Sequence, residues 1–292
     1  MRKRRAEKSK VIKSIPEKIV FGIVFVLFFI YALAILYFFY FAFSASLKES
    51  GRAFIKDMIS FPIPPHFENF ITAFKELNLY NATFWTMTMN SVIYTCGMTF
   101  LGMFSSSMAA YVVAKYNFKL KNVLYTIAII VMIIPIYGSL PAQYKLLSDL
   151  HMTDSYLYIL SCTGGLGYNF ILIYSFFRVI SWDYAEAAFI DGAGHFFVFF
   201  RIMLPMALPA ITALIISSFV ANWNNYANPI LFYPNHPTLA SGIFQYQQKI
   251  SYMANEPVYF AGVLISLIPP VALFIAFQDT LMNKVYAGGL KG

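Results

Sequence analysis

The chain has 292 residues, of which 59% are hydrophobic, 19% aromatic and only 12% charged, against roughly a quarter charged in an average soluble domain. A globular protein of this length needs a charged surface, which 21 Lys and Arg with 13 Asp and Glu cannot supply. These numbers exclude a water-soluble domain and predict an integral membrane protein. The formal charge of +8 does not indicate nucleic-acid binding, because many of the basic residues gather at the N-terminus.

The chain begins with a basic segment, residues 1–18, followed by an uncharged stretch over residues 19–43. A membrane-spanning helix needs about 20 apolar residues. The uncharged stretch is too long for the apolar part of a signal peptide, so we expect a retained helix. The basic segment is interpreted as the signal that keeps this end of the chain in the cytoplasm.

Further uncharged stretches predict five more membrane-spanning helices, over residues of about 84–114, 122–144, 155–177, 208–232 and 257–278. Backbone groups inside lipid need hydrogen bonds within their own segment, which favours helices. The prediction is therefore an all-α membrane protein with one transmembrane domain over residues 19–292. Six spans place both termini on one side, and the distribution of Lys and Arg makes that side cytoplasmic.

The cytoplasmic connection between the fourth and fifth spans, residues 178–207, has an unusual composition. Ser181 is a suitable helix start, acidic residues follow where the helix dipole favours them, and alanines favour the helix. We expect this helix to stop at Gly192, with Gly194 adding freedom to the turn. The connection thus predicts a short helix followed by a sharp corner.

A second short helix is predicted from about His195. Four apolar residues, at i, i+3, i+4 and i+7, form one stripe on it: Phe196, Phe199, Phe200 and Met203. Pro205 and Pro209 are predicted to end this helix and to set the entry into the fifth span. Such an apolar patch needs a cover, and for the second helix a position on lipid or under its own bundle stays open beside a protein partner. The acidic first helix favours a soluble protein partner over anionic lipid.

Residues of this connection resemble the EAA loop of bacterial ABC importer permeases. The matching residues are Glu186-Ala187-Ala188, then Gly192 at the family's spacing, then Ile202-Met203-Leu204-Pro205. Two further stretches resemble the sugar permeases of the maltose-transporter type. They are Trp223-Asn224-Asn225-Tyr226, with Asn where the family has Glu, and Ala287-Gly288-Gly289-Leu290-Lys291-Gly292, with Gly and Leu where the family has Ala and Val.

This resemblance implies a type I ABC importer permease in the bacterial inner membrane, surrounded by lipid. A homologous second permease would complete the pathway, two cytoplasmic ATPase subunits would bind ATP and Mg, and an external solute-binding protein would deliver a sugar. The short helix would dock on an ATPase, with Glu186 facing basic groups there. The implied coupling residues are Glu186, Ala187, Ala188, Asp191, Gly192 and Pro205.

An intramembrane enzyme is the main alternative from another class, and the residues disfavour it. The histidines are scattered and no HExxH motif is present. The glycine run at 164–167 lacks the Lys-Ser/Thr ending of a phosphate-binding loop. Cys96 and Cys162 are interpreted as small packing residues. We therefore expect a chain that is not an enzyme and that binds no metal, cofactor or nucleic acid itself.

The predicted spans contain no charged residue, which favours a neutral polar solute. It also disfavours ion-coupled transport, which usually needs ionisable groups inside the membrane. Amides bond hydroxyls in both directions, and aromatic rings cover the apolar face of a sugar. The candidate pathway residues are Asn90, Trp223, Asn224, Asn225 and Tyr226. Two alternatives stay open. These residues could serve helix packing and the membrane interface instead of contacting the solute. Separately, the solute could be a peptide or phosphate instead of a sugar.

Overall fold

The computed structural model describes residues 15–79, 81–134, 138–161, 164–253 and 255–279. These residues form helices and loops, with a single isolated β-bridge between Leu79 and Ala82. Three features of the sequence lie outside the described residues: most of the basic segment, Cys162, and the C-terminal stretch at 287–292.

Two helices of 32 residues confirm the first two predicted helices. α1 (Ile15–Ser46) covers the stretch 19–43, and α4 (Phe84–Lys115) covers 84–114. The side chain of Thr83 caps α4 by accepting a hydrogen bond from the N–H of Thr86 at 3.3 Å. Between them lie the short helices α2 (Gly51–Lys56) and α3 (Glu68–Glu76).

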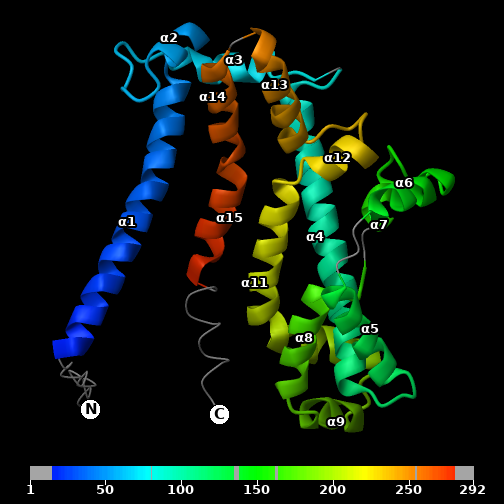
Figure 1. The fold of residues 1–292 in the computed structure, drawn as a ribbon. Helices are drawn as coiled ribbons and strands as arrows, with labels where there is room; N and C mark the ends of the chain where they lie inside the picture. The colour runs from blue at the N-terminus through cyan, green and yellow to red at the C-terminus, as the bar shows by residue number, and fades with distance from the viewer. Residues whose placement is uncertain (1–14, 80, 135–137, 162–163, 254, 280–292) are drawn as a thin grey trace.

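The prediction of one helix over 122–144 is wrong. The chain forms α5 (Lys121–Ile133) and then, after a break, α6 (Ser139–Asp149). Ile134 is extended because the next residue is proline, which disfavours helical backbone before it. Gly138 then has a positive φ of 81°. Figure 1 shows α6 beside α7 and away from α5.

The prediction of one helix over 155–177 is also wrong. α7 (Leu157–Ser161) and α8 (Tyr168–Val179) are separate helices. The glycine-rich residues 164–167 lie between them, and glycine has the poorest helix propensity after proline. The length of an uncharged stretch therefore did not predict helix continuity.

The fifth predicted helix is displaced toward the N-terminus. α10 (His195–Val198), the π-helical segment η1 (Phe199–Met203) and α11 (Leu204–Trp223) follow without a gap. The predicted end at residue 232 is wrong, since α12 (Ala227–Phe232) is a separate helix. The Asn224 and Asn225 side chains bond to nearby backbone at this break and so compete with the helix.

Pro205 and Pro209 do not end the second short helix, contrary to the prediction. Pro205 lies in the first turn of α11 and is exposed, and Pro209 lies inside the helix. In η1, just before them, the N–H of Leu204 bonds to the carbonyl of Phe199, five residues back. A π segment of this kind changes the hydrogen-bond register without breaking the helix. α10, η1 and α11 therefore form one continuous helix that includes both prolines.

The last predicted helix, over 257–278, is confirmed in extent. After α13 (Leu239–Met253) come α14 (Glu256–Ser266) and α15 (Ile268–Asp279), which meet at Leu267, just before two prolines. Among the described residues, four apolar helices are long enough to cross a membrane: Pro16–Ser46, Phe84–Lys115, His195–Trp223 and Glu256–Gln278.

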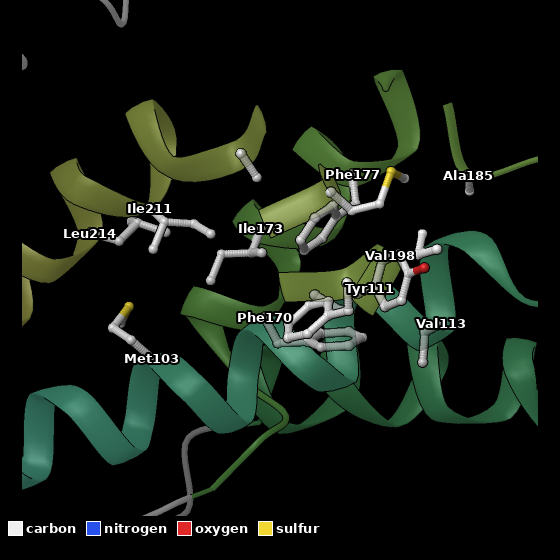
Figure 2. Packing of buried hydrophobic residues seen from close by; sticks show 14 of the residues in the cluster. Met103, Tyr111, Val113, Phe170, Ile173, Phe177, Ala185, Val198, Ile211 and Leu214 are labelled. Carbon is white, nitrogen blue, oxygen red and sulfur yellow. The ribbon is translucent and has the colours of Figure 1, made fainter. Parts of the chain in front are cut away.

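The helices form a bundle in which α4 packs along α8 and α11. Figure 1 shows α1 leaning away from this bundle, joined to it near α2 and α14. The start of α1, the end of α15 and α9 (Asp183–Ile190) lie toward one end of the molecule, and α2, α3 and α13 lie at the other. The largest buried cluster lies near α9 and includes Tyr111, Phe177 and Val198 (Figure 2).

Candidate coupling site

The helix predicted after Ser181 is present as α9. The carbonyl of Trp182 accepts hydrogen bonds from the N–H groups of Ala185 at 2.8 Å and Glu186 at 3.1 Å, which makes Trp182 the N-cap. The hydroxyl of Ser181 accepts from the N–H of Asp183 at 3.2 Å. Asp183 and Glu186 lie in the first turn, where the positive end of the helix dipole stabilises negative charge.

Gly192 ends this helix, as predicted. The N–H of Gly192 bonds to the carbonyl of Phe189 at 3.0 Å, and the N–H of Ala193 bonds to the carbonyl of Ala188 at 2.9 Å. This is the Schellman pattern, whose corner residue needs the left-handed conformation. Gly192 has a φ of 84°, and an added Cβ would meet no atom within 4 Å. Backbone conformation alone therefore requires glycine here.

Gly194 does not use the freedom that was predicted for it. Its φ of −80° and ψ of 162° belong to ordinary extended backbone, which any residue adopts. The corner thus depends on one glycine, and the second helix begins directly after it at His195.

The exposed side of α9 has a distinct composition. Its exposed residues at i, i+3, i+4 and i+7 are Asp183, Glu186, Ala187 and Ile190, which we call the α9 outer face. Asp191 and Gly192 are exposed beside it. The side chain of Ile190 is 86% exposed, although a large apolar side chain is usually covered. Two carboxylates, one small residue and one uncovered apolar residue suit contact with a basic, partly apolar partner.

The opposite side of α9 fixes the helix to the bundle. Ala185 is fully buried, and Figure 2 shows it in the cluster with Phe177 and Val198. The ring of Phe189 lies 6.0 Å from the ring of Trp182 and 4.9 Å from the ring of His195. Ala188 is half-buried against the same cluster. A force on the outer face is therefore passed to packed side chains.

The predicted apolar stripe of the second helix is divided in the structure. Phe199 and Met203 are buried, whereas Phe196 and Phe200 are 72% and 42% exposed. The prediction assumed a regular α-helix, but η1 has π geometry from Phe199 to Met203. The wider turn changes which residues share a face, so part of the stripe packs within its own chain.

A cavity of about 500 Å³ lies beside α9. It lies between the end of α8, the start of α9 and the start of α11. Its lining residues are Ser175, Phe176, Val179, Ile180, Ser181, Tyr184, Met206 and Ala207. Three elements that meet at residues 178–207, which we call the candidate coupling loop, thus share one recess.

Two candidate pathway residues have buried structural roles. Trp223 is 3% exposed, and its indole N–H donates to the carbonyl of Ser266 at 2.9 Å. Asn90 is 6% exposed, and its amide donates to the carbonyl of Pro237 at 3.1 Å. These contacts hold helices together, in line with the packing alternative.

The other three candidates are more accessible. The Asn224 amide donates to the carbonyl of Val220 at 3.0 Å within its own helix end, and Asn224 is exposed. Asn225 accepts from the N–H of Asn228 at 3.1 Å. The ring of Tyr226 stacks on Phe244 at 4.2 Å and remains 43% exposed. The structure therefore places these three at the end of α11, apart from the contacts of Asn90.

A polar contact between α4 and α11 was not predicted from the sequence. The Asn222 amide donates to the hydroxyl of Thr99 at 3.2 Å. Thr99 is buried, as are Ser91 and Thr95 on the same face of α4. The spacing of these hydroxyls at i, i+4 and i+8 is the sequence signal that marks this face. A cavity of about 420 Å³ next to Thr99 lies between α4 and α11.

Comparisons with known proteins agree with this architecture. The family model described as "Binding-protein-dependent transport system inner membrane component" matches residues 98–285. The diacetylchitobiose uptake system permease protein NgcG of Streptomyces coelicolor is 27% identical over 250 residues, which are 84% of this chain and 80% of that protein. The arabinooligosaccharides transport system permease protein AraQ of Bacillus subtilis is 29% identical over 289 residues, which are 95% of this chain and 98% of that protein.

A solved structure, described as a bacterial ABC transporter involved in the import of the acidic polysaccharide alginate, has the same fold. The TM-score is 0.74 and the sequence identity is 23%, over 91% of this chain and 98% of that chain. At this identity the similarity establishes the helical arrangement alone and does not identify the solute.

Proposed function

The chain belongs to the family of binding-protein-dependent transport system inner membrane components, and we propose that it is a permease subunit of an ATP-driven sugar or oligosaccharide importer. The names of the relatives NgcG and AraQ support a carbohydrate solute. The observation that carries the proposal is the exposed α9 outer face. The opposite side of α9 is buried against the bundle through Ala185, and the helix ends at the Gly192 corner. A permease that receives mechanical work from a separate ATPase needs such a contact.

The work would reach the membrane through one continuous helix. His195–Trp223 runs from the coupling loop to the break at Asn224 without interruption. At 1.5 Å per residue, its 29 residues span roughly 43 Å, more than the hydrocarbon thickness. A shift of α9 then moves the far end of α11 as a rigid body, the usual form of alternating access.

The family membership supports the proposed assembly. A homologous second permease would complete the pathway, two cytoplasmic ATPases would bind ATP and Mg and hold α9, and an external binding protein would deliver the solute. We propose six membrane crossings, two of them by broken helices, with both termini cytoplasmic. In support, the start of α1, α9 and the end of α15 lie toward one end (Figure 1).

We assign solute contact to the accessible residues Asn224 and Tyr226, with Asn225 supporting the turn. Trp223 and Asn90 would position helices around the pathway. Substituting Asn224 by Ala removes an amide whose protein bond is only local. Reduced uptake with unchanged assembly would support solute contact.

Uptake measured against ATP hydrolysis tests the coupling role. The complete assembly is purified through a tag on this chain, reconstituted in vesicles with its binding protein, and offered labelled arabino-oligosaccharides and diacetylchitobiose. We expect Glu186→Ala and Gly192→Pro to lower uptake per ATP roughly tenfold or more, because one removes the charge and the other forbids a φ of 84°. Wild-type uptake in both variants would contradict the proposal.

Two glycines provide a matched control. Alanine at Gly192 costs roughly 1–2 kcal/mol in the left-handed conformation, whereas Gly194 already has a φ suitable for alanine. We expect Gly192→Ala to reduce coupling and Gly194→Ala to leave it unchanged. Uptake of a peptide or inorganic phosphate in place of the sugars would favour the alternative solute class while keeping the permease role.

A further inference from the structure

Tyr116 connects the end of α4 to the coupling loop. It follows Lys115 in an extended conformation, with a φ of −92° and a ψ of 153°. Its ring lies 5.6 Å from the rings of both Trp182 and His195. Its hydroxyl lies 2.8 Å from Nδ1 of His195, a hydrogen bond between residues 79 positions apart.

The two partners of Tyr116 lie at opposite ends of the coupling element. Trp182 is the N-cap of α9, and His195 is the first residue of α10, after the Gly192 corner. One side chain at the end of α4 therefore contacts the residue before α9 and the first residue of the helix after it. A contact at one end would let α9 pivot, whereas contacts at both ends prevent it.

Neighbouring contacts reinforce this attachment. The ammonium of Lys115 donates to the carbonyl of Ile180, where α8 ends. The ring of Phe189 contacts His195 at 4.9 Å, which links the middle of α9 to the partner of Tyr116. The ring of Tyr111, one helical turn before Tyr116, meets it edge-on at 5.6 Å. The end of α4 thus contacts the residues on both sides of α9.

We propose that Tyr116 is a positioning residue that makes α9 and α4 move as one body when the ATPases close. The inference rests on the proposed function. It adds α4 as a second path by which movement of α9 reaches the membrane domain, beside the continuous helix that leads into α11. α4 carries the buried hydroxyl row of Ser91, Thr95 and Thr99, so movement of α9 reaches the polar interior directly. Deleting one atom, the hydroxyl oxygen of Tyr116, removes the Tyr116–His195 hydrogen bond from this attachment.

Tyr116→Phe removes the hydroxyl and keeps the ring. A hydrogen bond of this kind shifts an equilibrium by about fivefold, so we expect uptake per ATP hydrolysed to fall by about that factor, with little change in thermal stability. His195→Phe should have a similar effect, because both changes remove the Tyr116–His195 bond. The double variant should lose little more than Tyr116→Phe alone, which also removes the 3.5 Å contact between the Tyr116 and Tyr111 hydroxyls. Tyr125→Phe is the matched control, since the ring of Tyr125 on α5 lies tilted against the ring of Tyr174 on α8, with the ring centroids 4.7 Å apart.

A distance measurement separates positioning from simple packing. Spin labels are placed on exposed Cys96 of α4 and on Ser181→Cys, just before α9, in a Cys162→Ala background. We expect the same narrow distance distribution in the wild-type assembly with and without a non-hydrolysable ATP analogue. In Tyr116→Phe the distribution should broaden and shift with nucleotide.

Three results would overturn the inference: a wild-type distance that changes with nucleotide, a Tyr116→Phe distribution equal to the wild type, or an unchanged ratio of uptake to hydrolysis. Failure of the proposed function has a different signature. The wild-type assembly would then import none of the tested oligosaccharides, while the distance measurement, which needs only the folded assembly and nucleotide, still gives its result.

Discussion

α1 and α4 have the same length of 32 residues and opposite surroundings. Every residue of α1 from 16 to 40 is exposed, whereas α4 has buried positions along its whole length. The more hydrophobic helix is the exposed one. The buried polar residues of α4 are Asn90, Ser91, Thr95, Thr99, Ser106 and Ser107.

This contrast shows what the bilayer does to the usual rule of burial. Lipid tails are as apolar as leucine, so apolar side chains gain little by leaving lipid for protein. Polar side chains gain partners by facing other helices, and small residues let helices approach closely. On α4, unlike α1, polar and small side chains are therefore buried together with apolar ones, and the predictions below test what burial contributes on matched residues.

Truncation of a buried aromatic residue should have the largest effect. Phe84 in α4 is 1% exposed and packs against Phe74 with ring centroids 4.7 Å apart, whereas Phe28 in α1 is 69% exposed. We expect Phe84→Ala to cost about 3–5 kcal/mol, because it leaves a cavity. Phe28→Ala should change the free energy of unfolding by less than about 0.5 kcal/mol.

The measurement is an unfolding titration of the isolated full chain with SDS in mixed micelles. Using the isolated chain matters, because a second permease in the assembly would provide α1 with new contacts. Equal losses in the two variants would show that α1 packs against its own bundle and would contradict the contrast with α4.

The two long helices α1 and α4 were predictable from the sequence because their boundaries are local. α1 and α4 are apolar runs bounded by charges or caps, and their ends fell within a few residues of the prediction. The end of α9 was predicted because one glycine supplies a conformation that other residues avoid. Features encoded by one or two adjacent residues were thus accessible from the sequence.

Other features depend on partners far along the chain. Trp223 bonds to Ser266 and Asn90 bonds to Pro237, and neither sequence neighbourhood indicates the other. The π segment at η1 keeps the helix intact past Pro205, whereas local propensity predicts a stop. The break after Ile133 was missed because charge-free length, and not the following proline, was used to set the helix end. The coupling roles of Glu186 and Gly192 remain predictions.

Loss of a buried hydrogen bond should have a smaller effect than loss of a buried ring. Thr99→Val removes the acceptor of the Asn222 amide, at 3.2 Å, and keeps the shape of the side chain. Bonds between membrane helices average about 0.6 kcal/mol and reach about 1.7, so we expect a loss within that range. Thr212→Val is the control, because the Thr212 hydroxyl bonds only to Leu208 on its own helix. An equal loss in both variants would remove the special role of the α4–α11 contact.

The smallest effect is expected at the C-terminal end of α1, where its burial begins. Ser44 to Lys48 are buried, and the Lys48 ammonium donates to the carbonyl of Asp57. The Asp57 carboxylate accepts hydrogen bonds from the Ser60 hydroxyl and from the N–H groups of Ser60 at 3.1 Å and Ile59 at 3.2 Å. Led by the Ser60 hydroxyl, these bonds lower the pKa of Asp57 from 3.8 to about 2.

A lowered pKa in the folded state means that this loop is most stable above the unfolded value, about 3.9, and loses that stability as pH falls toward 2. Amide exchange at Ile59 and Ser60, corrected for intrinsic rates, should therefore accelerate between about pH 4 and 2, while amides in the middle of α4 keep their protection. Asp57→Asn should abolish the pH dependence, because an amide does not titrate in this range. A persistent pH dependence in that variant would assign the transition to another group and would leave the buried end of α1 held by Lys48 and its packing alone.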